Sequence, residues 1–66
     1  MKNTIRVQRA IQGITQGELA ERISVSRQTI NAIETNKYIP STLLALKIAR
    51  LFNKSVEEIF ELEEGE

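Results

Sequence analysis

The sequence has no cysteine and no histidine among its 66 residues. The lack of cysteine excludes a disulfide and a thiolate metal site, and the lack of histidine removes the commonest general base and metal ligand. No apolar run approaches the ~20 residues that a membrane span needs, and the charged opening segment is not typical of a signal peptide. We therefore expect a cytoplasmic protein that uses no metal or cofactor and enters no membrane.

Catalytic patterns are also absent. No glycine-rich phosphate loop, nucleophile elbow or cluster of metal ligands is present. Glu57 and Glu58 are neighbours in the sequence, so on a helix their carboxylates diverge and do not face one substrate. The sequence therefore predicts that the protein is not an enzyme. A chain this short buries only ~60% of its unfolded surface, which favours association with a second copy or a partner.

The charges are separated along the chain, although the formal net charge is zero. Residues 1–54 contain all nine lysines and arginines and only three glutamates, whereas residues 55–66 contain the other six glutamates and no basic residue. A basic body can face phosphates while an acidic end stays away from them, so the near-neutral isoelectric point does not exclude nucleic acid. The alternative role of the acidic C-terminal tail, residues 61–66, is solubility alone.

Residues 16–35 predict two short helices joined by a tight turn. Their apolar residues recur at helical spacing on one face of each helix, with Val25 at the corner between them. Thr15 and Glu18 have the spacing of a capping box for the first helix, and Ser26 is the expected N-cap of the second. The second helix then presents outward-facing donors and acceptors that match base edges and phosphates.

The remaining elements follow from apolar spacing and from two further caps, Ser41 alone and Ser55 with Glu58 in a second capping box. Helices are expected at about residues 3–12 or 4–12, at 42–52 and at 56–60, with stops at Gly13, Asn36 and Asn53. In the first helix, Ile5 is expected on a mixed face and Val7 and Ile11 among the apolar contacts. The alternation in residues 61–63 is typical of a short edge strand, which needs residues 2–4 or another chain as its partner.

A set of five motifs extends over most of the chain. They are Thr15-Gln16-Gly17-Glu18-Leu19-Ala20, Val25-Ser26-Arg27-Gln28-Thr29-Ile30, Ile33-Glu34, Pro40-Ser41 and Leu44-Ala45-Leu46-Lys47-Ile48-Ala49. Together they resemble the lambda-repressor/Cro-like regulators of the XRE type, and the layout is similar to the small cytolysin-repressor type. The resemblance implies an all-α fold: one compact five-helix DNA-binding domain over residues 1–66, with its helix-turn-helix at 16–35. Ser24 departs from the glycine usual in the turn, and a positive φ there would cost about 1 kcal/mol.

The helix at residues 27–34 is expected to enter the major groove, the groove that distinguishes all four base pairs. Arg27 can bind guanine O6 and N7, Gln28 can bind adenine N6 and N7, and Asn31 can reach a further base. Phosphate contacts are expected from Gln16, Ser26, Thr29, Lys37 and Tyr38. Two alternatives stay open, because Thr29 also suits a thymine edge and Tyr38 also suits packing on the core.

By the same resemblance, an ion pair between Arg9 and Glu34 would link the first and third helices; the alternative is two solvated charges. Binding by one short helix is weak, so we expect a homodimer on a palindromic operator with half-sites about 34 Å apart. Its interface is expected to use Ile39, Leu43, Phe60 and Leu62.

The expected action is repression by occupying a promoter, and activation through contact with polymerase remains an alternative. A second hypothesis is a protein-interaction module, with which the acidic end and the spare leucines are compatible. Salt-dependent retention on heparin or DNA separates the two hypotheses.

Overall fold

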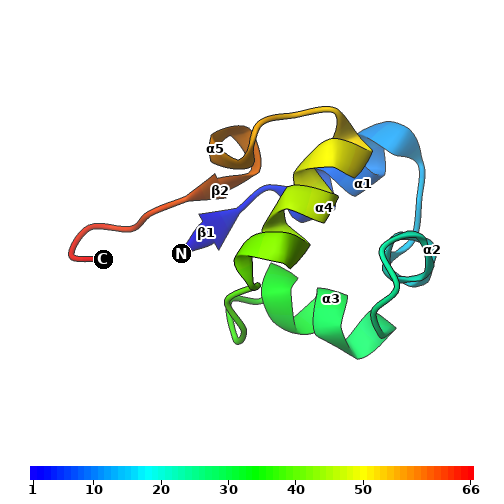
Figure 1. Cartoon of the computed structure of the whole chain (residues 1–66), viewed down its shortest axis with the longest axis horizontal. Coiled ribbons are helices and arrows are strands. Elements are labelled where there is room, and N and C mark those ends of the chain that lie inside the picture. The colour runs from blue at the N-terminus through cyan, green and yellow to red at the C-terminus, as the bar shows by residue number, and fades with distance from the viewer.

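The computed structural model describes all 66 residues and contains five helices and two short strands (Figure 1). Along the chain these are β1 (Lys2–Asn3), α1 (Ile5–Gln12), α2 (Gln16–Arg22), α3 (Arg27–Glu34), α4 (Thr42–Phe52), α5 (Val56–Ile59) and β2 (Phe60–Glu61). The predicted five-helix fold with a terminal antiparallel ribbon is confirmed. None of the helices has the length and hydropathy needed to span a membrane.

Local hydrogen bonds explain where the helices begin. The backbone N–H of Glu18 donates to Thr15 Oγ1 at 3.0 Å, and the N–H of Thr15 donates back to Glu18 Oε1 at 3.0 Å. Ser55 and Glu58 repeat this reciprocal box at the start of α5. The helices α3 and α4 begin at single serine caps in the predicted positions. The cap predictions are confirmed because a cap depends on residues only three positions apart.

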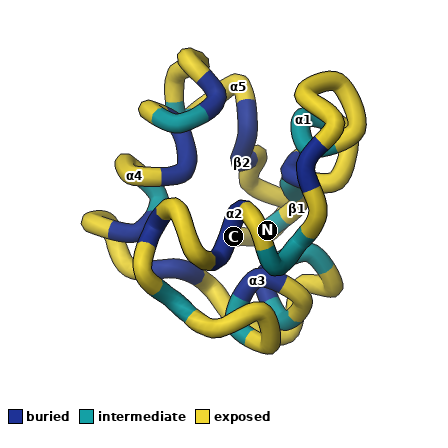
Figure 2. Tube along the Cα trace, turned by 90° about the vertical axis from the view of Figure 1, so that its right-hand side faces the viewer, coloured by how far each residue is buried: buried dark blue, intermediate teal, exposed yellow.

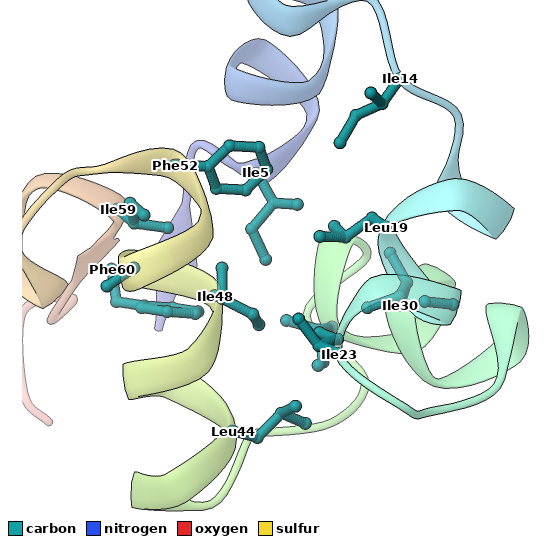
Figure 3. Close-up of a cluster of buried hydrophobic side chains, with 13 residues drawn as sticks. Ile5, Ile14, Leu19, Ile23, Ile30, Leu44, Ile48, Phe52, Ile59 and Phe60 are labelled. Carbon is teal, nitrogen blue, oxygen red and sulfur yellow. The ribbon is translucent and has the colours of Figure 1, made fainter.

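The core lies where the five helices converge (Figure 3). Thirteen apolar residues are buried there, and they come from every helix, from β2 and from two connections. Ile48 of α4 points into the middle of this cluster, between the side chains of α5 and β2 and those of α2 and α3. Six side chains are essentially inaccessible to solvent: Ile5, Leu19, Ile30, Ile33, Ile48 and Ile59.

The orientation of α1 differs from the sequence prediction. Ile5, expected on a mixed face, has 0% exposed surface, whereas Val7 and Ile11, expected as apolar contacts, are 55% and 73% exposed. The inward face of α1 also carries Arg9, whose guanidinium meets Glu34 of α3. Residues i and i+4 share a helix face, so burying Ile5 together with Arg9 turns Val7 and Ile11 outward. Apolar spacing misjudged this helix because an ion pair occupies part of its buried face.

The two chain ends meet in the ribbon. β1 and β2 pair antiparallel, with Lys2 opposite Glu61 and Asn3 opposite Phe60, so the N-terminal segment is the strand partner. α5 ends at Ile59 because Phe60 is extended, with φ −114° and ψ 136°, and it begins β2. The predicted helix therefore ends one residue earlier than expected, and the strand expected at 61–63 lies at Phe60–Glu61. Phe60 is only 6% exposed and packs in the core, which corrects its place in the predicted dimer interface.

Three residues other than glycine have a positive φ: Ser24 at 61°, Asn36 at 62° and Asn53 at 55°. Asparagine tolerates this left-handed conformation better than most residues, because its short polar side chain can bond locally. Ser24 follows α2 in the turn before α3, at the position where glycine was expected from the resemblance. Ser24 therefore has the positive φ for which the sequence predicted backbone strain in this turn.

Ser24→Gly is expected to raise the free energy of unfolding by about 0.5–1 kcal/mol. The gain from relieving the left-handed backbone exceeds the loss from a more flexible unfolded chain. Thermal unfolding should show a melting temperature higher by a few degrees. Ser24→Ala is the matched control, because alanine keeps the Cβ that opposes positive φ. A variant no more stable with glycine than with alanine would contradict the strain at this position.

Candidate nucleic-acid interface

α2 and α3 form the predicted helix-turn-helix, and packing on one side of each helix holds them against the core. Leu19 and Ala20 of α2 and Ile30 and Ile33 of α3 are buried. Val25, at the corner between the helices, is half-buried and packs against the same core. Figure 1 shows α3 along an edge of the molecule, and its residues range from exposed to buried (Figure 2). One side of α3 is therefore open to a ligand.

The open side of α3 carries the side chains predicted to read bases. Arg27, Gln28 and Asn31 are all exposed, whereas Ile30 and Ile33 on the other side are buried. The three exposed residues lie within the first five positions of the helix. A guanidinium and two carboxamides on a protruding helix supply the hydrogen-bonding groups that match base edges in the major groove.

Four of the five predicted phosphate contacts lie near the two ends of α3, and the fifth, Gln16, begins α2. The hydroxyl oxygens of Ser26 and Thr29 are 2.9 Å apart, and the Thr29 backbone N–H donates to Ser26 Oγ at 3.1 Å. Lys37 and Tyr38 follow the C-terminal end of α3, and both are exposed. Tyr38 is 46% exposed as a residue, so it is open to a ligand on at least one side.

The structure brings Arg9 of α1 and Glu34 of α3 together. Arg9 Nε donates to Glu34 Oε2 at 2.7 Å and Arg9 Nη2 donates to Glu34 Oε1 at 3.1 Å, a two-bond arrangement. Arg9 Nη1 also donates to the backbone oxygen of Ile14 at 3.1 Å. The Glu34 side chain is 1% exposed and the Arg9 side chain 15%. These are therefore not two solvated charges, and the pair ties α1 to α3.

The Glu34 carboxyl remains charged despite its position. Burial alone raises its pKa, but hydrogen bonds from Arg9 and Gln16 and the nearby positive charges of Arg9 and Arg6 outweigh burial, so the pKa lies below its ordinary value of 4.5. The same pair acts on the cation, since the hydrogen bond to Glu34 raises the pKa of Arg9 in spite of partial burial. Glu34 is thus an anion at neutral pH, and it can only accept hydrogen bonds.

Gln16 connects this ion pair to the open side of α3. Its Nε2 donates to Glu34 Oε1 at 3.1 Å and to Asn31 Oδ1 at 3.3 Å. Gln16 also borders a shallow pocket at the first turn of α2, together with Gly17 and Arg27. The first residue of α2 therefore contacts both a buried and an exposed residue of α3, and it braces the two motif helices.

Comparison with known proteins agrees with this geometry. A helix-turn-helix family model matches residues 5–59 of the chain. The chain belongs to the XRE-type helix-turn-helix regulators. Members of this family regulate transcription by binding DNA, and the protein is therefore a regulator of that class.

The regulator is similar over its whole length to proteins from archaea and bacteria. An uncharacterized HTH-type transcriptional regulator of Methanocaldococcus jannaschii is 50% identical over 66 residues, which are 100% of both chains. YgzD of Bacillus subtilis, also named an uncharacterized HTH-type transcriptional regulator, is 48% identical over 64 residues, 97% of each chain. One from Methanothermobacter thermautotrophicus is 49% identical over 65 residues, 97% of this chain and 94% of its own.

The sequence interpretation missed one residue that supports the interface of the regulator. Asn3 Nδ2 donates to the backbone oxygen of Ile33 at 2.9 Å and to Asn36 Oδ1 at 3.4 Å. The Ile5 backbone N–H donates to Asn3 Oδ1 at 3.2 Å. Asn3 thereby ties the start of α1 to the end of α3. The bonds to Ile33 and Asn36 span 30 and 33 residues, and no local pattern in the sequence indicates them.

Proposed function

We propose that the protein is a dimeric repressor that inserts α3 into the major groove of a palindromic operator. The observation that carries this proposal is the exposure of Arg27, Gln28 and Asn31 on one side of a helix whose other side is buried. Arg27 binds guanine, Gln28 binds adenine and Asn31 reaches a further base. The regulator then blocks polymerase by occupying the promoter, and it acts in the cytoplasm.

Contacts to the DNA backbone position the helix but carry no sequence information. We assign these contacts to Ser26 and Thr29 at the start of α3, to Lys37 and Tyr38 after its end, and to the backbone N–H of Gln16 at the start of α2. Selection of bound sites from a random duplex library tests the whole proposal. The expected result is an enriched palindrome with half-site centres about 34 Å apart. If the selection enriches no site, the proposal is wrong.

Arg27→Ala is expected to weaken binding to the selected site by about 1–3 kcal/mol and to relax specificity at one base pair, because a fork to guanine is lost. Lys37→Ala is the matched comparison. It should weaken binding to selected and random DNA alike. It should also reduce the slope of the logarithm of the affinity against the logarithm of the salt concentration by about one. Titrations at several salt concentrations measure both. Equal losses on selected and random DNA for Arg27→Ala would contradict its role.

The proposed dimer interface rests on apolar side chains that the single chain leaves open. Ile39 is 64% exposed, Leu43 65% and Leu62 69%. Leu43 also lines a groove between α4 and α5, which Leu46, Ala49 and Val56 share. Since Phe60 is part of the core, we now leave it out of the interface. Exposed apolar side chains beside such a groove favour contact with another protein surface.

Leu43→Glu is expected to weaken self-association by at least about tenfold, since it places a charge in the apolar contact. Sedimentation velocity across a concentration series measures the effect. Ile11→Glu is the matched control, because Ile11 is exposed to a similar degree, at 73%, but lies on α1. If both variants associate like the parent chain, or if the parent stays monomeric at tens of micromolar, the proposed interface is wrong.

Binding of a protein partner is the second candidate function. Leu62 is exposed within the acidic tail, and every residue from Glu61 to Glu66 is exposed. A chain that works only through this tail would not be retained on heparin or DNA, whereas a DNA-binding regulator elutes from both at a defined salt concentration.

A further inference from the structure

We infer that Gln16 sets the base preference of Asn31, by holding its side-chain amide so that only N–H donors face the DNA. Asn31 would then select an acceptor edge, guanine or thymine, and would not form the paired contact to adenine that an unrestrained asparagine can form. This inference rests on the proposed function, because it assigns a specificity to α3 within the major groove. It makes Gln16 and Glu34 positioning residues for base recognition.

The first step concerns the orientation of the Gln16 amide. Its end group faces Glu34 Oε1 at 3.1 Å, and the Glu34 side chain is 1% exposed. A carboxylate has no donor, so only the NH₂ end of the amide can satisfy it. The amide oxygen in that place would meet a negative charge in a site shielded from water. The buried acceptor therefore decides which way the glutamine points.

The second step carries that orientation to the open side of α3. The Gln16 NH₂ group has two hydrogens, and its nitrogen lies 3.3 Å from Asn31 Oδ1. Because that nitrogen is a donor, the Asn31 amide must turn its oxygen inward to accept. Its NH₂ group then faces outward, and Asn31 is exposed. The series of hydrogen bonds from Arg9 through Glu34 and Gln16 thus ends at Asn31, whose side-chain N–H groups can donate to a ligand.

The third step is the match to bases. Adenine presents the N6 donor beside the N7 acceptor, so recognising it with two bonds requires both an acceptor and a donor from the side chain. With its oxygen turned inward onto Gln16, Asn31 cannot direct that acceptor at the N6 donor of adenine. Guanine offers two acceptors, O6 and N7, and thymine offers O4, and each suits outward N–H groups. Asn31 is therefore expected to disfavour adenine at the base pair it contacts.

The test measures the relative affinities of duplexes that carry each of the four base pairs at the position contacted by Asn31. That position is the one at which Asn31→Ala loses discrimination. The parent chain should favour guanine or thymine over adenine by at least about fivefold, the lower range for a mismatched base pair. Gln16→Leu, which removes both donors, should reduce that preference to less than about twofold. Gln12→Leu, at an exposed glutamine of α1, is the matched control and should leave it unchanged.

A second variant inverts the outward polarity. Asn31→Asp keeps an oxygen for Gln16 but turns another acceptor outward, so the preference should move to cytosine or adenine, whose edges carry donors. These readouts are ratios between DNA sequences, so a general loss of stability in a variant does not imitate them. In the free protein, nuclear magnetic resonance should show the Asn31 side-chain amide shifting in Gln16→Leu and not in Gln12→Leu.

The possible failures are distinguishable. If the parent chain enriches no DNA site, the proposed function fails and the inference fails with it. If it enriches sites but prefers adenine at the Asn31 position, or if Gln16→Leu keeps the parent preference, the inference alone is overturned and DNA binding stands. An Asn31 amide signal that is indifferent to Gln16→Leu also overturns it, whatever the DNA results are.

Discussion

Replacing Ile5 by alanine is expected to lower the free energy of unfolding by about 2–5 kcal/mol. Ile5 is 0% exposed and belongs to the core cluster that all five helices build. Truncation removes buried methyl groups and leaves a cavity that the surrounding side chains refill only in part. The whole free energy of unfolding of a domain of this size is about 3–10 kcal/mol. The substitution should therefore remove a large fraction of the stability of the domain.

The matched control lies on the same helix. Ile11 is 73% exposed, so Ile11→Ala is expected to change stability by no more than about 0.5 kcal/mol. Urea unfolding followed by circular dichroism measures both variants. The comparison is decisive for the orientation of α1, because both residues are isoleucines in one helix and apolar spacing alone assigned them the other way round. Equal losses at the two positions would mean that α1 is rotated relative to the structure.

Replacing Arg9 by methionine is expected to lower the free energy of unfolding by about 3 kcal/mol. Methionine keeps much of the packing of the arginine stem but leaves the Glu34 carboxylate, 1% exposed, without its main partner. We expect the lower end of the range for a broken buried pair because Arg9 itself is 15% exposed. Arg6→Met is the control, since Arg6 is 77% exposed and lies 3.9 Å from Glu34. It should change stability by at most about 0.5 kcal/mol.

The pH dependence of the Arg9 variant provides an independent check. In the parent chain the pKa of Glu34 is below 4.5, so its contribution to stability is complete above that pH and is lost as pH falls through the lowered pKa. In Arg9→Met, burial is no longer offset by Arg9, so the pKa of Glu34 rises and its carboxyl takes up a proton at a higher pH than in the parent chain. The difference in unfolding free energy between the two chains should therefore be largest near pH 7 and should narrow on acidification. A difference that stays constant to pH 3 would show that Glu34 is not the titrating group.

The parts of the fold that could be predicted from sequence are those governed by near neighbours. Thr15 with Glu18 and Ser55 with Glu58 form reciprocal caps, because each box needs only residues three apart. Asn53 ends α4 in a left-handed conformation for an equally local reason. The exposure of Arg27 and Gln28 follows from the spacing of Ile30 and Ile33 along one helix.

The ion pair between Arg9 and Glu34 could not be predicted from near neighbours. It was anticipated only through the resemblance to a family, since two charges 25 residues apart give no local signal that they meet. Its effect on α1 was not anticipated at all. Once Arg9 faces the core, Ile5 is buried with it and Ile11 faces solvent. The spacing of apolar residues alone does not take a buried ion pair into account.

By itself, the sequence determined the positions and caps of the helices, the helix-turn-helix and the hydrogen-bonding residues on α3, because periodicity and capping act over three or four residues. Only the tertiary structure decided which side of α1 is buried, that Phe60 belongs to the core, and which way the Gln16 amide points. These outcomes depend on groups brought together from distant parts of the chain. Burial then leaves few alternatives for these arrangements, because a buried carboxylate must be paired and the core must be closely packed.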